Sequence, residues 1–473
     1  MKPDHRFLDD LTETSTRVEP ALVTDDPDKE TWDADCDVLV VGVGLAGVCA
    51  ALRTSEDKNL QVIAIDRGEG GGASRLSGGV VYMGGGTRAQ KEAGIEDTPE
   101  NMANYLAFET GNLVRLDTVQ RFAEASVHFQ DWLESYGARF GGPATDEKTS
   151  YPETASIYYS GNELTVPGRE RAKPAPRGHR AKPAKGGEPT DLSGQYLLPP
   201  LIESMESQPN VRFFRQTRAT RMIVDGDGAV VGLEVMRIPP GFAAWRHAKY
   251  MSLVNNLIVA MLGMGGKIQS AIAGLERNKA KSLRIRVRKG VVLSAGGFTY
   301  NRTMMAKTAP DYLESHPLGT IADDGSGIKL GMTVGARTDL LDRISAWRFL
   351  YPPESWTNAC SVGPDGERLV GQCAISNVIR APVFLSCTIG YDVDEHEQGR
   401  GIATRLVRHV AHDALTTHRL HRVEAGTLVS NLGSQRVLEK CGFTRIGIAP
   451  RHVRIAGRWQ DHVLYVLTAE DLS

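Results

Sequence analysis

The fold of the first part of the chain is decided by residues 37–66, DVLVVGVGLAGVCAALRTSEDKNLQVIAID. The opening run DVLVV is continuously apolar, as expected of a buried parallel strand. The turn GVGLAG (Gly42–Gly47) follows, then a helix-forming stretch, then a second apolar strand that ends at Asp66. This order of strand, G-x-G-x-x-G turn, helix, strand and acid predicts a doubly wound, Rossmann-like α/β domain that binds a dinucleotide.

Each residue type in this stretch has a physical role. Gly42 permits the tight turn, Gly44 lets backbone N–H groups approach a pyrophosphate, and Gly47 allows close contact between helix and strand. The helix N-terminus adds partial positive charge. Asp66 lies 19 residues after Gly47, where a carboxylate can accept hydrogen bonds from ribose hydroxyls. The alternative is a glycine-rich turn that binds no ligand.

Composition places the chain among ordinary globular proteins. Its 473 residues are enough for two or more cores, and 41% hydrophobic with 24% charged residues is typical of a soluble protein. A net charge of −2 gives no general attraction to nucleic acid or anionic membranes. The six cysteines form no C-x-x-C pair, so we expect no metal site. Scattered thiols and a polar start without a signal-peptide pattern predict a cytoplasmic protein.

Two further segments leave alternatives open. Residues 253–275 contain an apolar run shorter than the roughly 20 residues of a membrane span. We expect a buried helical hairpin or a substrate-entrance flap, with membrane contact as the alternative because basic residues follow over 277–289. Residues 167–187, PGRERAKPAPRGHRAKPAKGG, are rich in proline, glycine and basic residues, which predicts a solvated surface loop. The alternatives are an anion-attracting entrance or a nucleic-acid patch, and the absence of interleaved aromatic residues speaks against single-stranded nucleic acid.

A second glycine-rich loop, GGGASRLSGG (70–79), can wrap the ribityl chain and phosphates of a flavin. With this loop the chain resembles the flavoprotein family of fumarate reductases, succinate dehydrogenase flavoprotein subunits and 3-ketosteroid dehydrogenases. The resemblance covers roughly residues 33–366. Its further motifs are DWLESYGARF (131–140), a strand pair over 211–235 with a hairpin turn at Asp227-Gly228, RVRKGVVLSAGGF (286–298) and DDGSGIKLGMTVGA (323–336).

The resemblance implies that the chain binds FAD as its cofactor and catalyses a hydride transfer. Hydride would move between flavin N5 and a C–C bond next to a carbonyl or carboxylate, in a steroid-like or dicarboxylate-like small molecule. Residues 218–220 match the place where the family's backbone holds adenine. No residue of the flavin part is assigned to catalysis. The implied FAD-binding residues are Gly42, Gly44, Leu45, Ala46, Gly47, Asp66, Arg67, Ser74, Arg75, Ser77, Gly78, Gly79, Ala219, Ala295, Gly296 and Asp324.

From about Glu367 the sequence changes character. A strand over 390–393 leads into DEHEQGRGIA (394–403) and then an amphipathic helix, TRLVRHVAHDAL. The spacing Gln398-x-x-Gly401-x-Ala403 resembles the [RQ]-x-x-G-x-[GA] pattern of the GCN5-related N-acetyltransferases. Small residues at such a turn let backbone N–H groups point at the CoA pyrophosphate.

The segments HRVEAGTLV (421–429), N-x-x-S (431–434) and the tail over 455–467 resemble the subgroup that acetylates the N-terminal residue of ribosomal proteins. This implies acetyl-CoA as cosubstrate and a protein or peptide amine as acceptor. Asn431 would orient the CoA arm. Ser434 would donate a proton to the leaving thiolate, or alternatively satisfy backbone donors at a helix start. The implied acetyl-CoA-binding residues are Val393, Gln398, Gly399, Arg400, Gly401, Ile402, Ala403 and Asn431.

The expected organisation is a polar extension over 1–34, an FAD-binding domain over 35–366 with an α+β cap insertion from about residue 300, and a mixed α/β acetyltransferase domain over 367–473. The flavin part lacks its family's C-terminal segment. The acetyltransferase part lacks its first strand and two acceptor helices. We therefore expect a chimera joined near residue 370. The leading hypothesis is an FAD-dependent oxidoreductase; the alternatives are an N-α-acetyltransferase and a non-functional chimera that at most binds a nucleotide.

Overall fold

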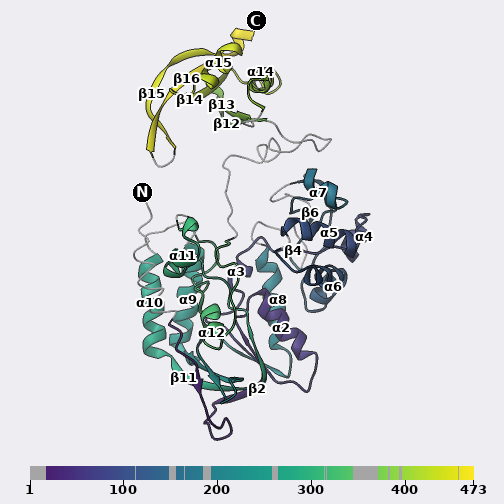
Figure 1. The fold of residues 1–473 in the computed structure, drawn as a ribbon, viewed down its shortest axis with the longest axis vertical. Coiled ribbons are helices and arrows are strands. Elements are labelled where there is room, and N and C mark those ends of the chain that lie inside the picture. Colours follow the sequence, from purple (N-terminus) through teal and green to yellow (C-terminus); the bar gives the residue numbers. More distant parts are fainter. Residues whose placement is uncertain are drawn as a thin grey trace.

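The structure is a computed structural model that describes residues 17–111, 113–148, 156–164, 166–184, 193–257, 265–313, 315, 317–344, 371–381, 384–393, 397–455 and 458–472. Within these ranges the strands form sheets of seven, four and five strands. Figure 1 shows the order of the elements along the chain by colour, from the purple N-terminal strands to the yellow C-terminal ones. The predicted junction near residue 370 lies outside the described residues.

The seven-stranded sheet carries the predicted dinucleotide unit. Its order is β1-β9-β10-β11-β2-β3-β8. Strands β11, β2, β3 and β8 run parallel to one another, whereas β10 is antiparallel to both β9 and β11. These strands span Leu22–Val23 (β1), Ala34–Val41 (β2), Val62–Ile65 (β3), Val211–Phe214 (β8), Thr217–Val224 (β9), Val230–Arg237 (β10) and Lys281–Leu293 (β11).

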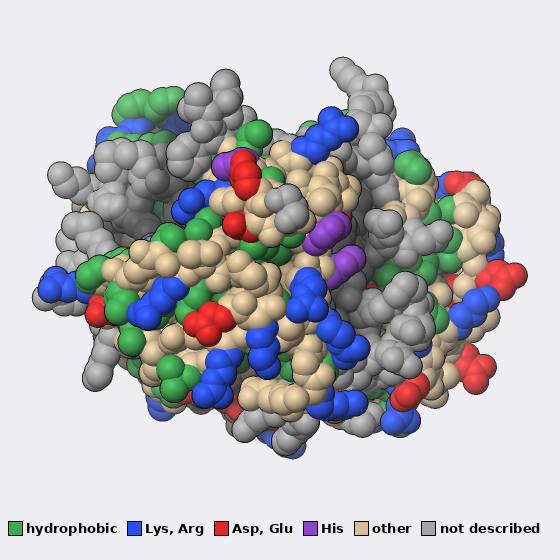
Figure 2. Space-filling view, turned by 90° about the horizontal axis from the view of Figure 1, so that it is seen from above, with side chains coloured by type: hydrophobic (Ala, Val, Ile, Leu, Met, Phe, Trp, Pro, Cys, Tyr) green, Lys and Arg blue, Asp and Glu red, His purple; other side chains and the backbone are tan. Residues whose placement is uncertain are grey.

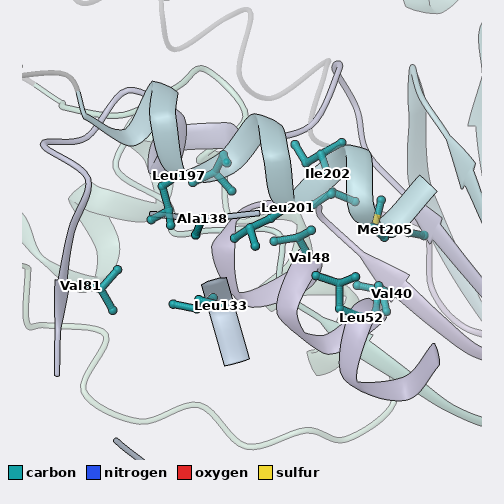
Figure 3. Close-up of a cluster of buried hydrophobic side chains, with 14 of the residues drawn as sticks. Val40, Val48, Leu52, Val81, Leu133, Ala138, Leu197, Leu201, Ile202 and Met205 are labelled. Carbon is teal, nitrogen blue, oxygen red and sulfur yellow. The ribbon is translucent and has the colours of Figure 1, made fainter. Parts of the chain in front are cut away.

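Side chains alternate between the two faces of this sheet along each strand, and both faces are covered by a hydrophobic core. Val40 packs into one core with helices α2 (Leu45–Ser55) and α8 (Gly194–Glu206), as Figure 3 shows. Leu39 packs into a second core on the other face. That core includes Leu330 of helix α12 (Ser326–Met332). The doubly wound α/β fold is confirmed.

The predicted strand pair over residues 211–235 is wrong in one respect. Residues 217–237 form the β9–β10 hairpin, and Gly228 at its turn has φ +82°. Asp225 Oδ1 accepts hydrogen bonds from the N–H groups of Asp227 and Ala229 at 3.0 and 2.9 Å. Residues 211–214, however, form the separate strand β8 at the far edge of the sheet, parallel to β3.

The prediction of a solvated loop for the basic segment over 167–187 is wrong for its helical residues and for the buried residues 175–181, whereas the side chains of residues 169–171 are exposed, as predicted. Residues 166–171 form helix α7, and residues 178–180 form strand β7 of the four-stranded sheet, whose order is β4-β7-β6-β5. Arg177 and His179 are fully buried. The remaining elements here are β4 (Val80–Tyr82), β5 (Ala144–Lys148), β6 (Ile157–Tyr159), β7 (Gly178–Arg180), α3 (Gly72–Arg75), α4 (Arg88–Glu92), α5 (Pro99–Glu109), α6 (Leu116–Ser135) and α7 (Val166–Arg171).

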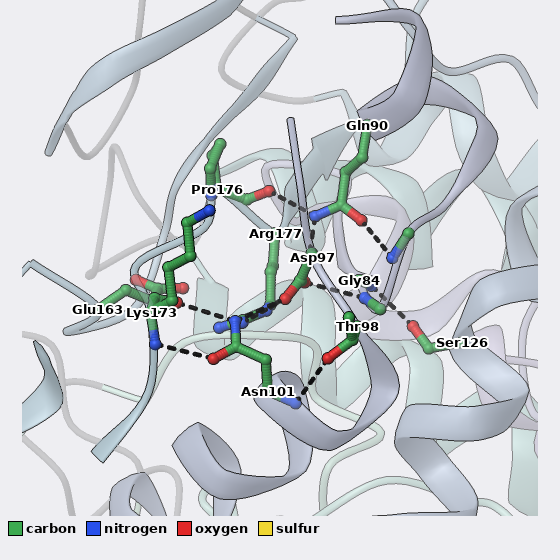
Figure 4. A network of polar contacts seen from close by, with 12 residues as sticks. Gly84, Gln90, Asp97, Thr98, Asn101, Ser126, Glu163, Lys173, Pro176 and Arg177 are labelled. Atoms are coloured by element: carbon green, nitrogen blue, oxygen red, sulfur yellow. Dashed lines mark hydrogen bonds and ion pairs between the residues drawn. The ribbon is translucent and has the colours of Figure 1, made fainter. Parts of the chain in front are cut away.

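Partners distant in sequence explain this burial. Backbone pairing with β4 and β6 satisfies the peptide groups of β7. Asp97 pairs with the Arg177 guanidinium in the polar network of Figure 4. The strand pairing and the ion pair with Asp97 both involve residues far away in the sequence, so they could not be predicted from the composition of this segment.

The apolar segment forms a helical hairpin in its described residues, as expected. Helices α9 (Phe242–Leu257) and α10 (Gly265–Lys279) pack together through Val254 and Ile272, and residues 258–264 between them lie outside the described ranges. No helix among the described residues is both long enough and apolar enough to cross a bilayer. After β11 come α11 (Arg302–Thr308), a 3₁₀ turn (Pro310–Tyr312) and α12.

The five-stranded sheet belongs to the C-terminal part and has the order β12-β13-β14-β16-β15. Strands β13 and β14 are parallel and the other pairs antiparallel, which confirms a mixed α/β domain. Figure 2 shows one face of the molecule, on which basic side chains lie among acidic and apolar ones. The elements are β12 (Gly371–Ala381), β13 (Phe384–Val393), α14 (Ile402–Thr416), β14 (Arg422–Leu428), α15 (Leu432–Lys440), β15 (Thr444–Ile455), β16 (Arg458–Thr468) and a 3₁₀ turn (Ala469–Leu472).

Candidate functional site

The glycine turn after β2 leaves no room for side chains. Gly42 has φ +94°, and a Cβ atom there would lie 2.6 Å from Ala295 Cα on the segment after β11. A Cβ atom on Gly47 would lie 1.8 Å from the carbonyl oxygen of Gly42. Only glycine fits such contacts. The turn therefore holds β2, α2 and the end of β11 together.

Gly44 has a different environment. It is the N-cap of α2, in extended conformation and without a side-chain cap, and a Cβ atom there would meet only Ser74 Oγ, at 3.6 Å. The N–H of Leu45 donates to the same Ser74 oxygen at 3.2 Å. The helix N-terminus thus opens onto the adjacent cavity, and its partial positive charge favours an anion there.

This cavity has a volume of about 740 Å³, within the range of small-molecule sites. It brings together the glycine turn, the end of β3, the loop around Ser74, strand β9 and the end of β11. Most of the implied FAD-binding residues line it. These are Gly42, Gly44, Leu45, Ala46, Asp66, Arg67, Ser74, Arg75, Ala219, Ala295 and Gly296.

The other implied residues are placed beside the cavity. Ser77 Oγ donates to the carbonyl of Ser74 at 2.7 Å and accepts from the N–H of Gly79 at 3.1 Å, so it closes the loop that also contains Gly78. Asp324 is buried in an ion pair, and its neighbour Asp323 lines the cavity instead. Contact of these residues with FAD stays a prediction.

Asp66 is held at the mouth of the glycine turn. Its Oδ2 accepts from the N–H of Val43 at 2.9 Å, and its Oδ1 accepts from the N–H of Gly68 at 2.7 Å. Both carboxylate oxygens keep further lone pairs. This geometry is compatible with the predicted bond to ribose.

Arg67 joins the cavity to helix α10. Its Nε lies 2.8 Å from Glu276 Oε1, and its Nη1 lies 2.9 Å from Asp324 Oδ2. His247 Nε2 lies 3.1 Å from Glu276 Oε1. Burial alone would raise the pKa of Glu276, but the charge of Arg67 and the hydrogen bond from His247 outweigh it and lower that pKa to about 2. The guanidinium of Arg67 is therefore already paired, with or without a cofactor.

Helix α9 supplies cavity residues that sequence reasoning missed: Trp245, Lys249, Ser252 and Asn255. Their spacing of three or four residues defines one helix face, and this pattern is the signal in the sequence that could have revealed them. Among the described residues, Asn255 Oδ1 and Arg218 Nε are buried without a hydrogen-bond partner. Both residues line the cavity, so a polar ligand such as FAD fits the groups present.

The second glycine loop precedes helix α14. Gly399 and Gly401 have φ +80° and +77°, and Gly401 is the N-cap without a side-chain cap. Val393 ends β13 before this loop, and Ile402 and Ala403 begin the helix. Gln398 and Arg400 are exposed, and Arg400 pairs with Glu397. The geometry suits a pyrophosphate at a helix N-terminus, and binding of acetyl-CoA there stays a prediction.

Asn431 and Ser434 have distinct local roles. Asn431 is the N-cap of α15, because its Oδ1 accepts from the N–H of Ser434 at 3.0 Å. The Ser434 hydroxyl instead lies 2.7 Å from the hydroxyl of Tyr391, which also donates to the carbonyl of Ser434 at 3.0 Å. Burial raises the pKa of Tyr391 to about 12, so its phenol is protonated at neutral pH. The alternative role of backbone capping thus falls to Asn431, and proton donation by Ser434 stays a prediction.

Comparisons with known proteins agree with both parts of this geometry. Residues 37–357 match the family model described as "FAD binding domain", and residues 331–444 match an "Acetyltransferase (GNAT) domain". The two matched ranges overlap over 331–357. The predicted boundary at residue 366 therefore stays a prediction.

Two relatives resemble the first part. The chain is 34% identical over 386 residues to a 3-oxo-5-alpha-steroid 4-dehydrogenase of Comamonas testosteroni, covering 79% of this chain and 68% of that protein. The crystal structure of a 3-ketosteroid-delta4-(5alpha)-dehydrogenase from Rhodococcus jostii RHA1, in complex with 4-androstene-3,17-dione, superposes with a TM-score of 0.56 at 28% identity. That match covers 68% of this chain and 58% of the crystallised one.

The C-terminal part is 32% identical over 108 residues to a [ribosomal protein uS5]-alanine N-acetyltransferase of Escherichia coli. The match covers 23% of this chain and 55% of that protein. The chain thus spans a little over half of this relative and of the crystallised dehydrogenase.

Proposed function

Because the chain belongs to the FAD-binding domain family, with a GNAT domain following, we propose that it is an FAD-dependent oxidoreductase. The proposed reaction oxidises a C–C single bond beside the carbonyl of a 3-ketosteroid-like substrate. The observation that carries the proposal is the cavity of about 740 Å³, in which the predicted FAD-binding residues converge. The steroid class is supported by the relatives from Comamonas and Rhodococcus.

FAD, when bound, accepts the hydride that such an oxidation releases, and the proton lost from the carbon beside the carbonyl leaves to solvent. The residues of this chain would hold the cofactor. The amide groups at the start of α2 would face the pyrophosphate, and Asp66, fixed by the backbone of Val43 and Gly68, would face the ribose. Close packing of Gly42 against Ala295 keeps the turn rigid, so the pyrophosphate site is formed in advance.

The test is anaerobic reduction of the flavin. The purified chain is reconstituted with FAD, and visible flavin absorbance is recorded after mixing with a 5α-reduced 3-ketosteroid or, in parallel, with succinate. We expect bleaching by the steroid alone. Bound flavin that neither compound bleaches would contradict the proposed reaction, and bleaching by succinate alone would replace the steroid class with dicarboxylates.

A second activity is favoured by the pair Tyr391–Ser434. We propose N-acetyl transfer from acetyl-CoA to the α-amine of a protein or peptide. The neutral amine would attack the thioester carbon, and the C–S bond would break. The Ser434 hydroxyl, 2.7 Å from the Tyr391 hydroxyl, would protonate the leaving thiolate, and the proton that the amine loses would restore the hydroxyl. The Escherichia coli relative supports the class of acceptor.

This activity is tested by thiol release from acetyl-CoA with a peptide that begins with alanine. We expect Ser434→Ala to lower the rate about 10²-fold or more. Ser430→Ala is the matched control, because Ser430 is exposed and precedes the helix. Equal rates for both variants would remove Ser434 from the mechanism, and absence of thiol release from the unaltered chain would remove the second activity.

A further inference from the structure

Helix α9 contributes a wall to the cofactor cavity that no glycine-rich motif explains. Trp245, Lys249, Ser252 and Asn255 line the cavity from a single face of the helix. Lys249 is exposed, so its ammonium can move to meet an anion. The wall therefore offers both charge and hydrogen-bonding groups to a ligand.

The wall borders the side of the cavity where adenosine is expected. A Cβ atom placed on Gly68 would lie 3.6 Å from Met251 Cε, so α9 passes within van der Waals distance of the chain two residues after Asp66. Ala219, whose backbone is predicted to hold adenine, lines the same cavity. Helix α9 thus lies next to the predicted ribose and adenine contacts.

Two buried polar atoms on this side lack a partner among the residues that the structure describes. They are Asn255 Oδ1, an acceptor, and Arg218 Nε, a donor. Native proteins leave few such atoms unpaired. Adenosine diphosphate carries hydrogen-bond donors on its base and ribose and acceptors on its ribose and phosphates. Because both residues line the cavity, a ligand there can offer hydrogen-bond partners to their side chains.

The wall is positioned independently of any ligand. His247 of α9 and Glu276 of α10 meet at 3.1 Å, and Glu276 meets Arg67 at 2.8 Å. Arg67 in turn meets Asp324, next to the start of α12, at 2.9 Å. This cluster ties the helical hairpin to the two loops that the FAD-binding motifs predict.

We propose that helix α9 is the adenosine-side wall of the cofactor site. Asn255 and Lys249 would contact the adenosine monophosphate half of FAD, which FMN lacks, and the site would select FAD over FMN through them. The proposal rests on the proposed function only in taking FAD as the cofactor.

The test compares the binding of FAD and FMN to apoprotein by quenching of flavin fluorescence. FMN lacks the adenosine monophosphate half. We expect Asn255→Ala to weaken FAD binding about tenfold and to leave FMN binding unchanged. Lys249→Ala should weaken FAD binding more at low than at high salt. Leu253→Ala, on the same helix and outside the cavity lining, is the matched control.

Each outcome decides a separate point. Parallel losses for FAD and FMN, or unchanged FAD binding in both variants, overturn the role of α9. FAD binding without steroid oxidation counts against the proposed function alone. An unaltered chain that binds neither flavin overturns both. Exposed Lys249 keeps the test valid if the change at Asn255 prevents folding.

Discussion

At the scale of single residues, a buried ion pair holds the small sheet to helix α5. Arg177 Nε and Nη2 each lie 2.8 Å from an oxygen of Asp97, and both side chains are 0% exposed. Burial would raise the pKa of Asp97, but the Arg177 guanidinium and the N–H of Gly85 outweigh it and lower the pKa. Charge and hydrogen bonding thus compensate for desolvation inside this sheet.

We expect Asp97→Asn to destabilise the flavin part by about 3–5 kcal/mol, because it leaves the Arg177 charge buried and uncompensated. The measurement is urea unfolding followed by tryptophan fluorescence. Glu96→Gln is the matched control at the neighbouring position, where the pair with Lys173 is exposed. A shift of the same size in both variants would show that burial of the pair is not the cause.

His179 is the middle residue of strand β7 and is fully buried. Its Nδ1 lies 2.9 Å from the carbonyl of Arg177, which can only accept, so Nδ1 carries the proton. Its Nε2 lies 3.0 Å from the Thr87 hydroxyl and accepts from it. Burial lowers the pKa of His179 to about 4. The neutral imidazole is therefore the folded form at neutral pH.

A pH dependence of stability follows. The unfolded chain takes up a proton at His179 near pH 6.5, whereas the folded chain does so only near pH 4. Stability is thus complete above pH 6.5 and is lost as the pH falls toward 4, by up to about 3 kcal/mol. In urea unfolding at several pH values, His179→Gln should flatten this decline. Exposed His409→Gln should retain it.

At the scale of elements, the α9–α10 hairpin depends on Glu276. Its carboxylate lies within contact of the Arg67 guanidinium and the His247 ring, inside a mostly buried cluster. Because the pKa of Glu276 is lowered to about 2, the carboxylate is charged throughout the physiological range. The negative charge of Glu276 therefore helps to hold the hairpin to Arg67 beside the nucleotide sheet, and a single substitution can remove that charge.

We expect Glu276→Gln to loosen the hairpin and to weaken FAD binding by about tenfold, since Arg67 then loses one of the two carboxylates that it contacts among the described residues. Hydrogen–deuterium exchange should rise over α9 and α10 and stay constant over β2 and β3. Glu124→Gln, an exposed position on α6, is the control. Unchanged exchange in the hairpin would show that apolar packing of Val254 and Ile272 suffices.

At the scale of the whole molecule, the core between the nucleotide sheet, α2 and α8 shares no residue with the core of the C-terminal part. One comprises the nucleotide sheet with α2 and α8, and the other comprises the five-stranded sheet with α14 and α15. Each glycine loop starts a helix of its own part, α2 in the first and α14 in the second. We therefore expect the two binding activities to be separable by substitution.

Gly47→Val tests this separation, because a Cβ atom at Gly47 would collide with the Gly42 carbonyl at 1.8 Å. We expect complete loss of FAD absorbance from the purified protein and unchanged acetyl-CoA binding in calorimetry. Gly274→Ala, where a Cβ atom meets no neighbour within 4 Å, is the control. Joint loss of both ligands would show that the second part needs the first to fold.

The local units could be predicted from the sequence, because their signals are short-range. Gly42, Gly44 and Gly47 predict the first turn because such a turn leaves little room for side chains, and Gly399 and Gly401 predict the second. Apolar runs predicted the buried parallel strands, and the apolar segment after residue 253 predicted the helical hairpin. These features depend on neighbours within one turn or one strand.

Which distant residues meet could be seen only in the folded chain. It placed Arg177 beside Asp97 and so turned an expected surface loop into a buried strand. It set Asp323 rather than Asp324 in the cavity wall, because Asp324 pairs with Arg67. It also brought α9 to the cofactor cavity. The free-energy cost of burying a charge, and its compensation by a partner, depend on residues far apart in sequence. They therefore cannot be predicted from local composition.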